Sequence, residues 1–178
     1  VFGVILGTGV GGGVVIDGRL LGGANAIAGE WGHNPLPWPR PEWGEVPGPT
    51  CWCGRAGCIE SYLSGPGLTA DHPDRTMSSR EIVAASQGGD PVARQAMARY
   101  EDRLARALAH MINILDPHVV VLGGGLSAID SLYDAVPRLW SRWIFSDVVA
   151  TRLLRNAHGD SGGVRGAAWL WPEPEAMG

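Results

Sequence analysis

The sequence predicts an α/β fold. Two apolar segments of strand length, residues 2–6 and 118–122, each run directly into a cluster of glycines. Between them, over residues 91–115, apolar side chains recur at three- and four-residue intervals, the spacing of an amphipathic helix. Buried strands that alternate with helices are typical of α/β domains.

The N-terminal segment predicts a strand followed by a hairpin. Residues 2–6 are nearly all apolar, as in a strand that is covered on both faces. A second apolar strand follows at 14–16, and Asp17-Gly18 is typical of a two-residue hairpin turn, so residues 19–21 are expected to return antiparallel. Because the chain opens inside such a strand and without a methionine, we expect an N-terminal lobe to precede it.

Residues 22–58 show little periodicity and are rich in glycine, proline and tryptophan. A long irregular segment in a compact domain is usually functional. Its Pro- and Trp-rich insert, residues 35–50, is expected either to shape a ligand pocket or to form a surface loop.

Helix signals begin at residue 59. Residues 59–64 look like a short helix that ends at 64–67, and residues 69–77 are polar and look like a connection. Ser78 and Glu81 form a capping box for a helix that runs to about residue 86.

The long helix is predicted to start at Asp90-Pro91 and to stop before Asp116-Pro117. Four of its arginines fall outside the apolar stripe, at positions 94, 99, 103 and 106. The remaining predicted elements are a strand at 118–122, a helix from about 129, a strand near 148–154 and a final helix around 163–171.

Composition limits the classes of function. The 178 residues are 45% hydrophobic and 18% charged, which fits a folded domain and not a disordered chain. The net charge of −4 argues against non-specific binding of nucleic acid, and no apolar stretch approaches the ~20 residues of a membrane span. Clustered cysteines fit a metal and a reducing compartment better than disulfides. We therefore expect a cytoplasmic protein with neither nucleic acid nor a membrane as its partner.

Three cysteines and one histidine predict a zinc site. Cys51, Cys53 and Cys58 fall within eight residues, after His33, and the chain has no other cysteine. Three thiols and an imidazole fill a tetrahedral Zn²⁺ site, and such a closed site leaves no position for activating water. The alternatives are free buried thiols beside an unrelated histidine, or a reactive thiolate, for which no basic partner is close in the sequence.

Two glutamates are interleaved with the metal ligands. Glu30 precedes His33 by three residues, and Glu60 follows Cys58 by two. A metal that fixes the loop would also fix these carboxylates, which accept hydrogen bonds and so suit a hydroxyl-rich ligand such as a sugar. His33 could bind zinc through one ring nitrogen and a sugar hydroxyl through the other. A solvated surface position is the alternative for either glutamate.

Two glycine runs follow strand ends. A glycine turn brings backbone N–H groups close to phosphate oxygens, and Thr8 adds a hydroxyl donor to the first run, residues 7–13. That run leads into a strand and lacks the Lys-Ser/Thr of a P-loop, so a simple tight turn is the alternative. Residues 123–125 join a strand to a helix, where ligands of open α/β sheets bind. Two such runs favour a nucleotide site.

Five motifs stand in order along the chain. They are Gly7-Thr8-Gly9-Val10-Gly11-Gly12-Gly13, Ala28-Gly29-Glu30-Trp31-Gly32-His33, Cys51-x-Cys53-Gly54-x2-Gly57-Cys58-x-Glu60, Ser64-Gly65 and Asp116-Pro117-x-Val119-Val120-Val121-Leu122-Gly123-Gly124-Gly125. Together they closely resemble the ROK family of sugar kinases and sugar-responsive repressors. Two stretches, residues 29–38 and 158–172, are similar to the bacterial fructokinase (mannokinase) branch.

The resemblance implies the two-lobed, actin-like (ribonuclease H-like) sugar kinase fold, with residues 1–178 as its C-terminal lobe and about 22–60 as its zinc- and sugar-binding segment. It implies a sugar held by Glu30, His33 and Glu60, and a structural zinc held by His33, Cys51, Cys53 and Cys58. ATP phosphates would meet Gly7, Thr8, Gly9, Gly11, Gly12 and Gly13, and the adenosine would border Gly123, Gly124, Gly125 and Leu126. The family usually forms homodimers or tetramers.

The implied activity is transfer of the γ-phosphoryl group of MgATP to the 6-hydroxyl of fructose, with mannose and glucose as further candidate sugars. We assign no catalytic residue in this chain and expect the general base in the N-terminal lobe. None of Asp17, Asp71, Asp116 or Asp160 sits in the family's base motif. The alternatives are a sugar-responsive repressor whose DNA-binding part lies upstream, and a zinc-stabilised interaction domain that binds no ligand.

Overall fold

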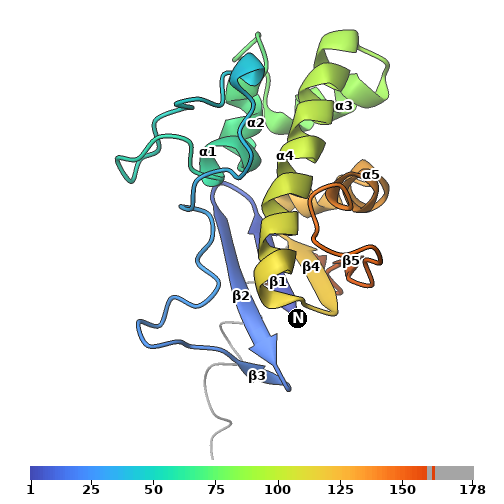
Figure 1. The fold of residues 1–178 in the computed structure, drawn as a ribbon. Coiled ribbons are helices and arrows are strands. Elements are labelled where there is room, and N and C mark those ends of the chain that lie inside the picture. Colours follow the sequence, from blue (N-terminus) through green and yellow to red (C-terminus); the bar gives the residue numbers. More distant parts are fainter. Residues whose placement is uncertain (160–161, 163–178) are drawn as a thin grey trace, which may run out of the picture.

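A five-stranded sheet forms the centre of the fold, with its strands in the order β3-β2-β1-β4-β5 (Figure 1). The computed structural model describes residues 1–159 and residue 162. The strands are β1 (Phe2–Leu6), β2 (Val10–Ile16), β3 (Arg19–Leu20), β4 (Val119–Gly123) and β5 (Arg152–Arg155). The combination of this sheet with helices confirms the predicted α/β class.

Strands β1 and β4 bring the two glycine runs to the same edge of the sheet. β1 pairs antiparallel with β2 and parallel with β4, so that Phe2 lies opposite both Val14 and Val120. Parallel strands end on the same side of a sheet, and the residues that follow these two strands are Gly7 and Gly124. The carboxyl ends of β1 and β4 are therefore the expected place for a shared ligand site.

The first glycine run is a short turn followed by a strand. Gly11, Gly12 and Gly13 belong to β2, and each is paired with a residue of β1. The prediction of a loop over residues 7–13 is therefore wrong for its second half. Of these three glycines, Gly12 is required because another segment crosses it: a Cβ on Gly12 would lie only 2.9 Å from the carbonyl oxygen of Gly29.

Helices α4 (Pro91–Leu115) and α5 (Ser131–Trp140) pack together against one face of the sheet (Figure 1). The β1 side chains that alternate toward the core, among them Phe2 and Val4, are buried, whereas Ile5 on the other face is 47% exposed. The sequence predicted that β1 would be covered on both faces. The described residues cover only one face of it. The predicted helix around 163–171 lies outside the described residues.

Residues 64–67 end one helix, as predicted, and begin a second helix that the sequence did not predict. After α1 (Glu60–Leu63), Ser64 caps α2 (Gly65–Asp71), because its Oγ accepts the backbone N–H of Gly67 at 3.0 Å. Pro66 stands in the first turn of α2, where its missing N–H costs no hydrogen bond. The connection predicted from residue 69 therefore starts inside α2, and β5 starts four residues later than predicted.

The other helix starts are confirmed. α3 (Ser79–Gln87) has the predicted capping box between Ser78 and Glu81. Asp90 caps α4 by accepting the backbone N–H of Ala93 at 2.8 Å. The described residues also contain two short 3-10 helices, η1 (Pro41–Trp43) and η2 (Gly125–Ala128). Among the described residues, no helix is both long enough and apolar enough to cross a membrane.

Two arginines of α4 are buried, although they fall outside its apolar stripe. Arg103 and Arg106 are 1% and 0% exposed. Glu45 reaches both from the Pro- and Trp-rich insert: its Oε1 lies 2.7 Å from Arg103 Nε and 2.9 Å from Arg106 Nη2. The insert is thus fixed to α4 by a buried ion cluster and is not a loose surface loop.

Candidate functional site

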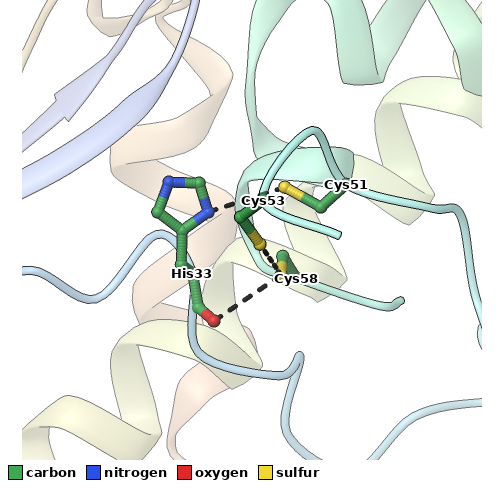
Figure 2. Close-up of side chains that lie close together, drawn as sticks. All are labelled: His33, Cys51, Cys53 and Cys58. Carbon is green, nitrogen blue, oxygen red and sulfur yellow. Dashed lines mark hydrogen bonds between the residues drawn. The ribbon is translucent and has the colours of Figure 1, made fainter. Parts of the chain in front are cut away.

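The predicted zinc ligands lie together in one cluster (Figure 2). The ligand atoms of His33, Cys51, Cys53 and Cys58 all lie within 4.8 Å of one another. Cys51 Sγ is 3.5 Å from His33 Nδ1, and Cys53 Sγ is 3.6 Å from Cys58 Sγ. Two sulfurs on one tetrahedral zinc ion lie about 3.8 Å apart, given Zn–S bonds of about 2.3 Å. The donor set and its spacing therefore fit structural zinc.

Backbone hydrogen bonds shape the segment of residues 51–58 that carries the three cysteines, here called the cysteine loop. The N–H of Cys51 donates to the carbonyl of Arg55 at 2.7 Å, and that of Gly57 donates to Pro49 at 2.9 Å. Gly54 and Gly57 have φ angles of 86° and 72°, a left-handed conformation that favours glycine. These turns are the reason that glycines stand between the cysteines.

The thiols differ in how readily they lose a proton. The backbone N–H of Arg55 lowers the pKa of Cys53 to about 7, whereas burial raises the pKa of Cys58 to about 12. Metal ligation requires thiolates, so Cys58 needs a cation beside it to ionise at neutral pH. His33 gives Cys51 a basic neighbour in space that was not close in sequence. Because all four groups converge, the cluster fits a metal site better than a single reactive thiol.

Glu60 joins the cysteine loop to the start of β2. Its Oε2 accepts the backbone N–H of Val10 at 2.9 Å, and its Oε1 accepts the indole N–H of Trp52 at 2.6 Å. The same Oε1 lies 4.0 Å from Nε2 of His33. His33 therefore stands between a thiol on its Nδ1 side and a carboxylate on its Nε2 side, an arrangement typical of metal-binding histidines.

The segment before His33 crosses β2 at close range. Trp31 is fully buried, and its indole N–H donates to the carbonyl oxygen of Gly11 at 2.9 Å. A Cβ on Gly29 would lie 2.7 Å from the Cα of Gly13, so this approach requires glycine. Gly12 and Gly29 thus allow the close crossing that leads to His33.

Glu30 is exposed, unlike Glu60. Its carboxylate makes no hydrogen bond or ion pair with the part of the chain that the structure describes. The structure therefore brings His33 and Glu60 together, and it leaves the Glu30 carboxylate on the surface with no partner among the described residues.

A hollow of about 670 Å³ lies where the end of β1 meets α2 and η2. Four of the predicted nucleotide-binding residues line it, namely Gly7, Thr8, Gly125 and Leu126. The rest of the wall consists of residues that sequence reasoning missed: Gly65, Pro66, Thr69, Ala70, Arg75, Ser78, Ser79 and Arg80. The helix-start signal at Ser64 could have pointed to α2, whereas nothing in the sequence marked the two arginines.

The other predicted nucleotide-binding glycines lie elsewhere. A separate hollow of about 460 Å³ is lined by Gly12, Gly13, Gly123 and Gly124, and neither hollow is lined by Gly9 or Gly11. Gly9 instead faces Glu60, because a Cβ there would lie 2.7 Å from its Oε2. The structure thus divides the predicted set among the two hollows, the contact of Gly9 with Glu60 and the contact of Gly11 with Trp31.

Comparison with known proteins decides the family. The family model described as the ROK family matches residues 1–174. This chain belongs to the ROK family. It is 44% identical over 175 residues to an N-acetyl-D-glucosamine kinase of Erwinia tasmaniensis, and the match covers 96% of this chain and 58% of that protein. The chain therefore spans little more than half the length of this ROK relative.

Solved ROK structures share the fold. The ROK hexokinase of Thermus thermophilus matches with a TM-score of 0.79 at 34% identity, over 94% of this chain and 57% of that one. A ROK family glucokinase from Streptomyces griseus, in complex with glucose and AMPPNP, matches with a TM-score of 0.80 at 28% identity, over 95% and 59% of the two chains. The chain thus has the fold of ROK sugar kinases, which is the actin-like ATPase fold.

Proposed function

We propose that the full-length gene product is an ATP-dependent hexose kinase. In it, this chain would supply the loop that binds zinc and the sugar, and one wall of the nucleotide site. The position of Glu60 is the observation that carries the proposal. Its carboxylate faces His33 in the cysteine cluster and accepts a hydrogen bond from the backbone N–H of Val10. Val10 directly follows the turn whose first residues, Gly7 and Thr8, line the larger hollow. Phosphoryl transfer requires a donor and an acceptor that are held side by side.

The sugar would be held by Glu30, His33 and Glu60. Each carboxylate oxygen of Glu60 already accepts one hydrogen bond, yet each keeps a lone pair that can accept a sugar hydroxyl. The exposed carboxylate of Glu30, which has no partner within the described part of the chain, could accept a second hydroxyl. Nε2 of His33 faces Glu60 Oε1 and so points toward the same region.

Zinc would be held by Nδ1 of His33 and by the thiolates of Cys51, Cys53 and Cys58. When bound, it would supply rigidity to the loop and no Lewis-acid chemistry, because four protein ligands close the site. The loop's own backbone bonds set its turns, and the ion would lock the imidazole against the cysteines.

MgATP would occupy the larger hollow. The backbone of Gly7 and the hydroxyl of Thr8 would meet the phosphates, and Arg75 and Arg80 would offset their negative charge. The adenosine would border Gly125 and Leu126, two of the four residues that the resemblance to the ROK family implies for it.

We propose that residues 1–178 form the C-terminal lobe and that the general base comes from an N-terminal lobe. Three aspartates considered for that role are used elsewhere. Asp71 is paired with Arg99 and Arg103 at 2.8 Å each, Asp116 caps α4, and Asp17 forms the hairpin turn. Asp160 lies outside the described residues.

We infer N-acetylglucosamine as the first candidate substrate and the 6-hydroxyl of fructose as the second. The first is supported by the relative from Erwinia tasmaniensis, whose substrate is given by its name. The second is supported by the fructokinase-like stretches at 29–38 and 158–172. Mannose and glucose complete the set of hexoses to compare. We also propose a cytoplasmic location, where ATP is available and thiols stay reduced, and a homodimer or tetramer.

A coupled ADP-release assay of the gene-encoded protein with each of these hexoses tests the proposal. We expect MgATP-dependent turnover with one hexose preferred over the others. Hexose binding without turnover, together with sugar-dependent binding of DNA, would assign the protein to the repressors of the family. Failure of all these hexoses to bind in calorimetry would leave a zinc-stabilised interaction domain.

A further inference from the structure

An exposed tryptophan, Trp52, lies in the cysteine loop. Trp52 lies between Cys51 and Cys53, two of the predicted zinc ligands, and the residue is 82% exposed. Its ring packs edge-on against His33, with the ring centroids 4.9 Å apart and an interplanar angle of 85°. A large aromatic group that is held this way and still open to solvent offers its apolar face to a ligand.

The polar edge of Trp52 is aimed at Glu60. The indole N–H donates to Glu60 Oε1 at 2.6 Å, and this is the oxygen that faces His33 Nε2. The other oxygen, Oε2, is held by the backbone N–H of Val10 at 2.9 Å. Two donors therefore fix the plane of the carboxylate, and removal of either would let the side chain rotate. A hydrogen bond to an ionised group is stronger than one between neutral groups.

The free face of the indole complements a hexose. One face of a pyranose or furanose ring carries C–H groups, whereas its hydroxyls lie around the rim. An apolar ring surface beside a fixed carboxylate can therefore contact the C–H face while the carboxylate accepts a rim hydroxyl. Trp52 and Glu60 present these two groups in direct contact.

We propose that Trp52 is a positioning and specificity-determining residue of the sugar site: its N–H orients Glu60, and its ring forms a wall against the sugar. This inference rests on the proposed hexose kinase function. It assigns to Trp52 an effect on the sugar that is separate from zinc binding and from the nucleotide.

Two variants of the gene-encoded protein separate the parts of this proposal. Trp52→Phe keeps an aromatic ring without the N–H, and we expect the KM for the preferred hexose to rise about tenfold, the effect of losing one hydrogen bond to a charged group. Trp52→Ala also removes the ring, and we expect a further rise of about tenfold from the lost apolar contact. The KM for ATP and the zinc content should stay within twofold of the wild type.

A double mutant and a distant control complete the test. If Trp52 orients Glu60, then Trp52→Phe should add little to the effect of Glu60→Gln in the double mutant. Phe145→Ala, which removes an aromatic side chain that is 99% exposed in another part of the fold, should leave the hexose KM unchanged.

The possible outcomes distinguish a failure of the role proposed for Trp52 from a failure of the proposed hexose kinase function. A wild type that turns over no hexose would overturn both. A wild type that turns over, with a hexose KM within twofold in both Trp52 variants, would overturn the role of Trp52 alone. Equal rises in the KM for hexose and for ATP, or loss of zinc from the variants, would also overturn it, since Trp52 would then only stabilise the loop.

Discussion

The carboxylate of Glu60 accepts the backbone N–H of Val10 at 2.9 Å, and this bond links the cysteine loop to the start of β2. Val10 directly follows the turn whose first residues, Gly7 and Thr8, line the larger hollow. One carboxylate thus lies between the proposed sugar site and the proposed nucleotide site. The substrates of a kinase must meet across such a short distance.

Glu60→Gln should weaken hexose binding and leave zinc in place. An amide has one acceptor oxygen and no charge, so it can satisfy Val10 or Trp52 but not both. We expect the hexose KM to rise at least about tenfold, with one zinc per chain retained by mass spectrometry. Loss of zinc would show that the carboxylate belongs to the metal site.

Gly32→Ala should destabilise the fold. A Cβ at Gly32 would lie 2.0 Å from the carbonyl oxygen of Val10, and backbone cannot yield as a flexible side chain does. We expect a loss of about 2–4 kcal/mol in the free energy of unfolding, in the range of overpacking and strain at a crowded site. Gly22→Ala is the matched control, since nothing lies within 4 Å of its added Cβ. Equal stabilities of the two variants would show that the crossing over β2 is loose.

Glu45 should make the stability of the protein depend on acid pH. Burial alone would raise the pKa of Glu45, but hydrogen bonds from Arg106 and Arg103 outweigh it and hold the pKa below its usual value. Its stabilising effect is therefore complete above the pKa of an unfolded glutamate, about 4.3, and is lost as the pH falls below that value. Urea unfolding from pH 7 to pH 3 should show this loss.

Glu45→Gln should flatten that acid limb and lower stability at pH 7 by about 1–3 kcal/mol, because Arg103 and Arg106 each lose one buried carboxylate partner while keeping Asp71 and Asp102, respectively. Glu42→Gln is the control, since its side chain is 62% exposed and lies 4.0 Å from Arg40. An unchanged acid limb in Glu45→Gln would mean that other carboxylates dominate.

Thr8→Val should affect the nucleotide and not the sugar. The change removes a hydroxyl from the wall of the larger hollow at nearly constant volume. We expect the KM for ATP to rise about three- to tenfold, as for one lost hydrogen bond, with the hexose KM within twofold. A rise in the hexose KM alone would move the nucleotide away from this hollow.

Local patterns predicted much of the fold. The Ser78–Glu81 capping box, the Asp90 cap and the convergence of the three cysteine sulfurs each depend on residues a few positions apart. The structure contains all three. The burial of Arg103 could not be predicted in this way, because its partner Glu45 lies 58 residues away within an irregular insert.

The glycines show a second limit. A glycine permits close approach of phosphate and close approach of backbone equally well, so the run from 7 to 13 looked uniform in sequence. The structure places Gly7 at the hollow, Gly9 against Glu60, and Gly12 beneath Gly29. Only the tertiary contacts separate these roles. The bond from Trp52 to Glu60 likewise depends on the path of the loop.

The dependence of the sugar site on zinc is tested most directly by calorimetric titration of the preferred hexose into the full-length gene product before and after removal of zinc. The prediction is one zinc per chain as purified, loss of hexose binding when a chelator removes it, and recovery when zinc is restored. Protein that contains no zinc, or that binds the hexose equally well after depletion, would contradict the claim that the His33–cysteine cluster orders the sugar site.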